Sequence, residues 1–300
     1  MEQHTRLKER RVEQVVTAHH QREGGGFMVR RPLPTRNLPL MDPFLLVDEL
    51  GPVTYAPGEA VGAPDHPHRG FETVTYLLQG EMQHKDSVGN HGTLGPGDVQ
   101  WMTAGGGVVH SEMPTSRLLD EGGVMHGFQI WVNLPAALKM SAPRYQEISR
   151  SEIPRGASED GLAHVSVIAG RALGVEAAID THTPIQYQDW TLKPGANVVT
   201  EVDPEHNVGI YVFSGIIKAG FDLQRVEAGQ FAVLREGSIV RLSVSAEETV
   251  EARVLLLAGL PINEPVARYG PFVMNTEQEL QQAARDYQSG RMGQIVQEVM

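Results

Sequence analysis

The chain has 300 residues, with 32 glycines, 19 prolines, 12 histidines and no cysteine. This length is enough for about two domains, and the lack of cysteine excludes disulfides, thiol nucleophiles and cysteine-held zinc. The net charge of −12 repels phosphate backbones and anionic lipids, so we expect neither direct nucleic-acid binding nor membrane attachment. Any metal must be held by His, Asp, Glu or backbone oxygen.

The N-terminal segment is charged and reads MEQHTRLKERRVEQ, with no apolar core of signal-peptide length. The longest apolar runs, such as residues 254–257, are far too short to span a membrane. We therefore expect a cytoplasmic protein. No motif in the first twenty residues indicates a role for them.

Residues 25–260 alternate short β-branched and apolar runs with Gly, Pro, Asn and Asp, which predicts an all-β protein of sandwich or barrel type. Gly89 and Asn90 predict a hairpin turn, because both residues tolerate positive φ. The strongest strand candidates are residues 71–78, 99–102, 128–132, 210–213, 231–234 and 254–257.

The two halves of the chain resemble each other. YLLQG at 76–80 resembles YVFSG at 211–215, and LGPG at 94–97 before an apolar run resembles VEAG at 226–229 before another. The repeat predicts a duplicated β-domain, with residues 1–145 forming the first domain and residues 146–300 the second. The stretch 135–161, rich in Pro, Ala and charge, is the expected linker.

After residue 260 the pattern becomes helical. Thr276 and Glu279 form a T-x-x-E capping box, and Ser289–Gly290 ends the run. One face of the expected helix consists of Leu280, Ala283, Ala284 and Tyr287. We expect a short C-terminal helix that packs by this face on the outside of a β-domain.

Two short motifs contain residues that bind metals, His66-Pro67-His68 and His110-Ser111-Glu112. Successive strand residues point to opposite faces, so each pair places two side chains on one face, about 7 Å apart at the backbone. Two such pairs on neighbouring strands would offer three imidazoles and one carboxylate to a single ion. Glycines 105–107 allow the bends that aim the second pair inward. Spacing alone favours a simpler interpretation, in which His66-Pro67-His68 is a surface turn and the second motif is an unrelated polar strand end.

A long segment around both motifs reads HPHRGFETVTYLLQGEMQHKDSVGNHGTLGPGDVQWMTAGGGVVHSEMP, and it closely resembles the pirin family of the cupin superfamily. The same resemblance holds for DPFLLVDELGP (42–52), HGFQIWVNLP (126–135) and EPVARYGPFVMNT (264–276). It implies a bicupin, two jelly-roll β-barrels with one mononuclear metal site in the N-terminal barrel. The pirin ligands correspond to His66, His68, His110 and Glu112.

The general cupin pattern would place a further carboxylate ligand at Glu72. The glycine-rich approach to His110 departs from that pattern and matches pirins, so we leave Glu72 out of the ligand set. Three imidazoles and one carboxylate leave open positions on a metal of higher coordination number, which suits catalysis or ligand binding. The resemblance implies Fe(II), and nickel, cobalt, manganese, copper and zinc fit the same ligands.

Other residues of the first half have two interpretations. Three histidines either orient a ligand or lie in turns and on the surface, namely His84, His91 and His126. Five residues either line a pocket for an aromatic substrate or fill the core, namely Gln100, Trp101, Met102, Phe128 and Trp131. In the second half, the repeat aligns Glu201, Asp203, Leu242 and Val244 with the four ligands. Two aliphatic side chains cannot bind a metal, so we expect no site there.

The resemblance implies one enzymatic function and one alternative. Some pirins are quercetin 2,3-dioxygenases, which cleave quercetin-like flavonols with O2 and release carbon monoxide. Glu112 would then be the catalytic base that takes the proton of the 3-hydroxyl. The alternative is a non-enzymatic, iron-binding and redox-sensing regulatory protein, for which the acidic composition favours a protein partner over DNA. A different enolisable substrate is a third interpretation.

Overall fold

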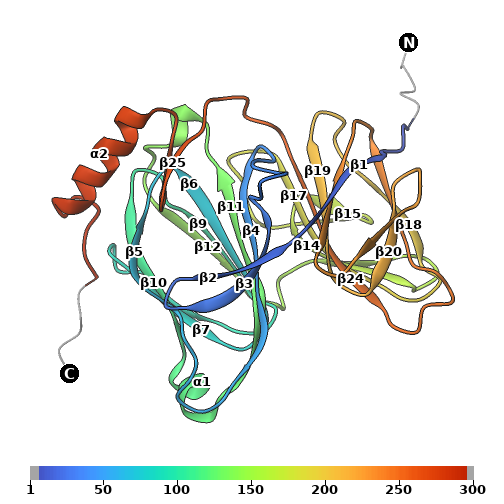
Figure 1. Cartoon of the computed structure of the whole chain (residues 1–300), viewed down its shortest axis with the longest axis horizontal. Helices are drawn as coiled ribbons and strands as arrows, with labels where there is room; N and C mark the ends of the chain where they lie inside the picture. The colour runs from blue at the N-terminus through green and yellow to red at the C-terminus, as the bar shows by residue number, and fades with distance from the viewer. Residues whose placement is uncertain (1–6, 296–300) are drawn as a thin grey trace. The chain divides into compact units, whose positions relative to one another are not determined.

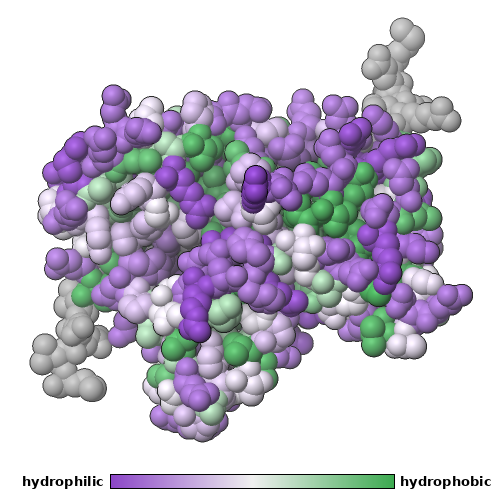
Figure 2. All heavy atoms as spheres, viewed as in Figure 1, coloured by the Kyte–Doolittle hydropathy of each residue, from purple (hydrophilic) through white to green (hydrophobic). Residues whose placement is uncertain are grey.

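The computed structural model describes residues 7–295 and confirms an all-β protein (Figure 1). Among these residues there are two α-helices, α1 (Ser116–Glu121) and α2 (Glu277–Gln288), and one 3-10 turn, η1 (Ala136–Leu138). Neither helix is long and apolar enough to cross a membrane. The visible surface is mostly polar, with smaller apolar patches (Figure 2).

The described chain forms two compact units. The site unit, which carries both histidine motifs, consists of residues 20–34, 43–151 and 262–295. The second unit consists of residues 7–19, 35–42 and 152–261.

The site unit is built from two antiparallel sheets and a hairpin. The larger sheet has the order β12 (Arg144–Ile148), β9 (Val99–Thr103), β6 (Phe71–Gln79), β11 (Gly123–Asn133), β4 (Phe44–Tyr55), β3 (Phe27–Leu33), β2 (His19–Glu23). The smaller sheet has the order β5 (Ala63–His68), β10 (Val108–Pro114), β7 (Met82–Asp86), β8 (His91–Leu94). The hairpin pairs β25 (Ala267–Tyr269) with β26 (Phe272–Met274).

The second unit repeats this plan. Its larger sheet has the order β1 (Val12–Thr17), β22 (Gln230–Leu234), β19 (Asn207–Ser214), β24 (Ala252–Gly259), β17 (Ile185–Leu192), β14 (Ala163–Ala169), β13 (Arg155–Ala157). Its smaller sheet has the order β18 (Asn197–Glu201), β23 (Ile239–Ser243), β20 (Ile216–Ala219), β21 (Gln224–Glu227), and a short ladder pairs β15 (Arg171–Ala172) with β16 (Val175–Glu176). In the described residues no ladder joins the two sheets of a unit, so each unit is a two-sheet sandwich, as expected for a jelly roll, and its sheets do not close into a continuous barrel.

All six strand candidates are strands, because their apolar runs supply the buried centres of the larger sheets. The turn at Gly89 and Asn90 lies between β7 and β8. Gly89 has φ +98°, a conformation that costs glycine little. The Asp86 carboxylate accepts hydrogen bonds from the backbone N–H of Val88 and Asn90, which closes the turn.

The units are not the two consecutive segments that the repeat suggests. Close to the expected boundary at 145, the site unit ends at Ser151 and the second unit continues from Glu152. The N-terminal residues 7–19 nevertheless belong to the second unit, and the C-terminal residues 262–295 belong to the site unit. Strand β1 pairs with β22 of the second unit, where Val16 lies opposite Phe231. Residues 262–295 belong to the site unit, where apolar side chains of α2 pack against Val109 and Phe272.

Helix α2 begins with the expected capping box, since Thr276 and Glu279 each bond the other's backbone N–H. Its buried face differs from the apolar face expected: Leu280 and Ala283 are buried, Tyr287 is 40% exposed, and Asp286 is buried instead. A buried carboxylate requires a partner. Asp286 has one in Arg69, which follows His68.

Candidate metal centre

The smaller sheet of the site unit brings the two histidine motifs together. His66 and His68 lie on β5, and His110 lies opposite His66 on the antiparallel neighbour β10. Nitrogen atoms of the three rings all lie within 4.8 Å of one another, and the Nε2 atoms of His66 and His68 are 3.1 Å apart. The three imidazoles therefore converge at one point, as a shared ion would require.

The rings meet at steep angles. The ring centroids of His66 and His68 are 4.7 Å apart with an interplanar angle of 86°, and those of His68 and His110 are 4.9 Å apart at 61°. The His66 and His110 centroids are 4.4 Å apart at 55°. The three rings are therefore packed together without stacking face to face.

The chemistry of the three rings fits a metal ion. His110 is fully buried, and within residues 7–295 neither of its nitrogens has a hydrogen-bond partner. Burial lowers the pKa of both His68 and His110 well below the usual value, so both imidazoles are neutral, the form that binds metals. His66 Nδ1 lies 2.7 Å from the Pro64 carbonyl, which makes Nδ1 the protonated nitrogen and leaves the Nε2 lone pair for a cation.

Glu112, two residues after His110 on β10, is not one of the three groups whose ligand atoms lie within 4.8 Å of one another. The β5–β10 register shifts between His110 and Glu112, and across β7 the residue opposite Glu112 is His84. Its Oε1 is 2.8 Å from the Thr75 hydroxyl, which is also 2.7 Å from Gln129 Oε1. A neighbouring hydroxyl thus holds one carboxylate oxygen at the wall of the histidine site.

Glu72 points elsewhere. Its Oε1 accepts a hydrogen bond of 2.7 Å from Thr103, the residue opposite it on β9. Glu72 and Thr75 are three positions apart on β6, so their side chains project from opposite faces. Thr75 contacts Glu112, and therefore Glu72 faces away from the site.

The other histidines have different surroundings. His84 is buried, with Nε2 2.6 Å from Glu147 Oε1, and His126 Nε2 lies 2.9 Å from Glu49 Oε1. His91 is exposed next to the β7–β8 turn. Among the aromatic-pocket candidates, Trp131 lines a cavity, whereas buried positions are taken by Gln100, Trp101, Met102 and Phe128.

A cavity of about 720 Å³ opens beside the histidines. Its volume is within the range of about 300–1,000 Å³ that small-molecule sites occupy. Most of the wall is apolar and includes Phe27, Leu46, Val53, Met125 and Trp131. The polar groups on the wall include His66, His68, Glu112, Arg31 and Arg268.

Aromatic rings pack together around Trp131 on the cavity wall. The Trp131 ring lies 5.3 Å from the His68 ring and 4.3 Å from the Phe71 ring, and the Arg268 guanidinium lies 4.6 Å above Trp131. Arg31 has both Asp48 and Glu23 as ion-pair partners. Within the described residues Arg268 forms no ion pair, and its Nη1 donates a hydrogen bond of 3.4 Å to the Leu45 carbonyl.

In the second unit the aligned positions carry other side chains. Leu242 and Val244 are buried in the apolar core. The Asp203 carbonyl accepts a hydrogen bond of 2.9 Å from the Arg10 guanidinium, which is almost fully buried. No local sequence pattern points to Arg10, Thr75, Arg268 or Asp286, because the partners of each residue are distant in the chain.

Two sandwiches of the same plan in one chain, one of them with a histidine cluster on its smaller sheet, define a bicupin. Residues 26–132 match the family model described as Pirin, and residues 187–293 match that of the Pirin C-terminal cupin domain. The chain belongs to the pirin family.

Named relatives agree over nearly the whole length. Pirin of Homo sapiens is 43% identical, with 93% of this chain and 92% of that protein covered. A Pseudomonas aeruginosa protein named as a candidate quercetin 2,3-dioxygenase is 40% identical, with 94% and 97% covered. The crystal structure of a quercetin 2,3-dioxygenase from Acinetobacter baumannii superposes with a TM-score of 0.89 at 38% identity, with 96% and 99% covered.

Proposed function

We propose that this protein is a metal-dependent quercetin 2,3-dioxygenase of the pirin type, which cleaves quercetin-like flavonols with O2 and releases carbon monoxide. The observation that carries the proposal is the convergence of His66, His68 and His110 beside a largely apolar cavity of about 720 Å³. The relatives from Pseudomonas and Acinetobacter support it through their names.

In this proposal the metal is held by His66, His68, His110 and Glu112. Fe(II) is the expected ion, and nickel, cobalt, manganese, copper and zinc fit the same donors. When bound, the ion supplies the positive charge that lowers the pKa of a substrate hydroxyl. Proton transfer and substrate orientation would be performed by the protein's own side chains.

Glu112 is the proposed catalytic base. Thr75 contacts its Oε1, so Oε2 is the oxygen that would take the proton of the flavonol 3-hydroxyl. This carboxylate is 8% exposed, so little water competes for that proton. The neutral imidazoles of His68 and His110 keep their lone pairs for the ion.

The cavity wall would orient a flat aromatic substrate. The Trp131 ring, packed on Phe71 and His68, offers an apolar surface close to the histidine nitrogens. Arg268 would donate hydrogen bonds to the oxygens of a phenol or phenolate at the same end. These contacts would place the hydroxyl near Glu112.

The test is turnover of quercetin by protein that is purified without oxygen and loaded with Fe(II). We expect uptake of O2 and release of carbon monoxide, and no turnover by a His66→Ala variant. A Glu112→Gln variant should lose at least about 100-fold in kcat while it keeps its metal. Glu59→Gln, at an exposed carboxylate, is the matched control and should keep wild-type kcat. Unchanged kcat in metal-loaded Glu112→Gln would remove Glu112 from the role of base.

The alternative is a non-enzymatic, iron-binding protein that senses redox state and binds a protein partner. The human relative is named Pirin, a name that states no enzymatic activity, and this is compatible with a regulatory role. No turnover with iron, nickel, cobalt, manganese or copper, in protein shown to bind the ion, would support it over the dioxygenase.

A further inference from the structure

We propose that the C-terminal strap, defined as residues 277–293, holds the metal-binding strands in register, with Arg69 and Asp286 as its positioning residues. The inference depends on the proposed metal site, and it assigns to the strap a role in metal affinity. The strap comprises helix α2 and the turn that follows it. Neither Arg69 nor Asp286 contributes a ligand; both would act through the peptide groups next to the ligands.

Arg69 links the two strands that carry the histidines. It follows His68 directly, and its Nε donates a hydrogen bond of 2.7 Å to the carbonyl of Gly106. Val108 lies opposite His68 in the β5–β10 ladder, so this bond lies just beyond the last pair of the ladder. The Arg69–Gly106 bond therefore holds β5 and β10 together at the end of the ladder where His68 lies.

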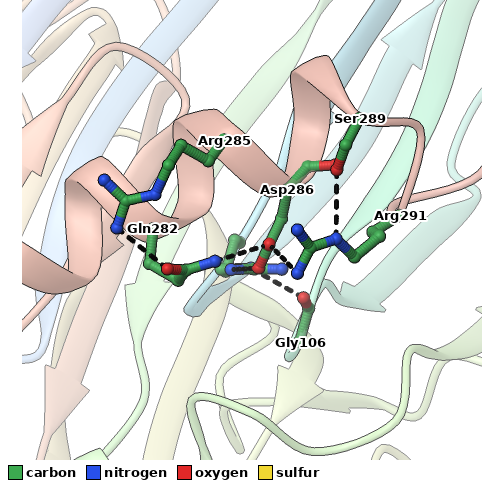
Figure 3. Close-up of polar contacts among 7 residues, drawn as sticks. Gly106, Gln282, Arg285, Asp286, Ser289 and Arg291 are labelled. Carbon is green, nitrogen blue, oxygen red and sulfur yellow. Dashed lines mark hydrogen bonds and ion pairs between the residues drawn. The ribbon is translucent and has the colours of Figure 1, made fainter.

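Asp286 fixes the direction of that guanidinium. Its Oδ2 accepts a hydrogen bond of 2.8 Å from Arg69 Nη1, and the two side chains are only 11% and 5% exposed. Its Oδ1 is 2.7 Å from Gln282 Nε2 and 2.8 Å from Arg291 Nη1. Figure 3 shows Asp286 pointing from the helix toward the strands, close to Gly106. Because the guanidinium is planar, its bond to the buried Asp286 carboxylate also fixes the direction in which Arg69 Nε points toward the Gly106 carbonyl.

The end of the strap is also linked to β10, through the Ser87 hydroxyl. The Ser87 hydroxyl donates a hydrogen bond of 2.8 Å to the Met292 carbonyl and accepts one of 3.1 Å from the Val109 N–H. A Cβ on Gly107 would lie 2.9 Å from Met292 Cγ, so the Met292 side chain packs closely over Gly107, the residue before β10. The apolar cluster beneath the strap includes Val109, Phe272, Met274, Leu280, Ala283 and Met292.

These contacts concentrate on peptide groups that adjoin ligands. Arg69 directly follows His68, Val109 directly precedes His110 on β10, and Gly107 is the residue just before β10. If the strap loosens, β5 and β10 can separate at this end, and the three nitrogens no longer stay within 4.8 Å. Groups that orient metal ligands from outside typically change metal affinity by about 10–100-fold when they are removed.

The test compares Asp286→Asn with Arg285→Gln, one position earlier on the same helix. Arg285 contacts Gln282 and does not reach Arg69, so Arg285→Gln is the matched control. We expect the nickel dissociation constant, measured by chelator competition, to rise about 10-fold for Asp286→Asn and to stay within about 2-fold for the control. The visible absorption spectrum of the cobalt-loaded protein should change in Asp286→Asn only. Asp286→Glu, which retains the charge, should restore part of the affinity.

Unfolding of the metal-free variants separates positioning from stability. Wild-type nickel affinity and an unchanged cobalt spectrum in folded Asp286→Asn would overturn the inference, even if the variant unfolds at a lower temperature. Wild-type protein that binds no nickel, with a His66→Ala variant that behaves identically, would overturn the metal site itself. The two failures are therefore distinguishable.

Discussion

Lys139 shows how a single charged residue can be part of the interior. Its side chain is 1% exposed, and Nζ donates hydrogen bonds to the carbonyls of Gly70 and Val273 and to Asn133 Oδ1. All three ammonium hydrogens are used, which compensates for the burial of the charge. Burial still lowers the pKa of Lys139 to about 8. Gly70 lies two residues after His68, the last residue of β5, so Lys139 connects the segment that follows β5 to the end of η1.

Replacing Lys139 with methionine should destabilise the site unit. Methionine has a similar length but no donor, so three buried acceptors would lose their partner, at a cost of about 3 kcal/mol in the free energy of unfolding. Urea denaturation at pH 7 measures the difference from wild type. Lys8→Met, at an exposed lysine, is the control. A change of less than about 0.5 kcal/mol in Lys139→Met would contradict the structural role.

The same lysine predicts a pH dependence. Its pKa is about 8 in the folded protein and 10.5 for a lysine exposed to water, so between these values the unfolded chain binds more protons. The stability contribution of Lys139 therefore rises with pH through this window, and the burial penalty is fully present below pH 8. Relative to Lys139→Met, wild type should gain about 2 kcal/mol between pH 7 and pH 9.5. A difference that is constant with pH would show that the folded-state pKa is not lowered.

Arg268 is the residue that we expect to govern substrate affinity. Because it stacks on Trp131 and has no described carboxylate partner, its loss removes a donor from the cavity without breaking an ion pair. Arg268→Gln should raise KM for quercetin about 10-fold and leave kcat within about 3-fold, since the metal ligands are untouched. Steady-state kinetics and quenching of tryptophan fluorescence measure the effect. Arg225→Gln, in the second unit, is the control; equal KM values for both variants would exclude this role.

At the scale of elements, the site depends on how closely β5 and β10 approach. Gly62 directly precedes β5, and a Cβ there would lie 2.3 Å from the Glu112 carbonyl oxygen and 2.8 Å from Met113 Cα. Only glycine permits this approach, because both opposing atoms belong to the backbone of β10. The close contact at Gly62 therefore fixes the start of β5 relative to the backbone of Glu112.

Gly62→Ala should displace β10 and weaken metal binding. We expect a nickel dissociation constant at least about 10-fold higher than that of wild type, because a shift of the strand moves the ligand geometry. Gly95→Ala is the matched control, since its Cβ would meet only Asp98 Oδ2, at 3.4 Å. Chelator competition at fixed pH measures both variants. Equal affinities would mean that the strands adjust around the added methyl group.

At the scale of the whole molecule, the chain builds one sandwich plan twice and equips one copy with the histidine cluster. The core of the second unit contains Leu242 and Val244 at the aligned ligand positions, and Arg10 donates to carbonyls of Asp203 and His206 nearby. In the site unit, buried imidazoles occupy the equivalent strands. Metal binding should therefore stabilise one unit and not the other.

Hydrogen exchange with and without nickel tests this asymmetry. A ligand that binds only the folded site unit adds about 2.7 kcal/mol at a concentration 100 times its dissociation constant. Peptides that cover β5 and β10 should gain protection, and peptides that cover β17 and β24 should not. Equal gains in both units would show that the two unfold together.

The sequence predicts the strands of the central sheets, the capping box of α2 and the two histidine motifs, because each of these is a local pattern. Alternation within a strand places His66 and His68 on one face, and Thr276 and Glu279 are three positions apart on one helix. It does not predict Asp286, which is on the polar side of the helical pattern, or Lys139, which lies in a stretch with the composition of a linker. Their burial depends on partners far away in the chain.

Local chemistry in this protein was therefore determined by the sequence alone: which residues can bind a metal, which segments form strands, and which family the chain resembles. The tertiary structure decided where those groups meet, how Glu112 and Thr75 pair, which unit each end of the chain joins, and that Arg69 is tied to Asp286. The physical reason is range. Strand alternation and helix capping act over a few residues, whereas burial and ion pairing depend on contacts between residues as far apart as Glu9 and Arg241, which are separated by 232 positions.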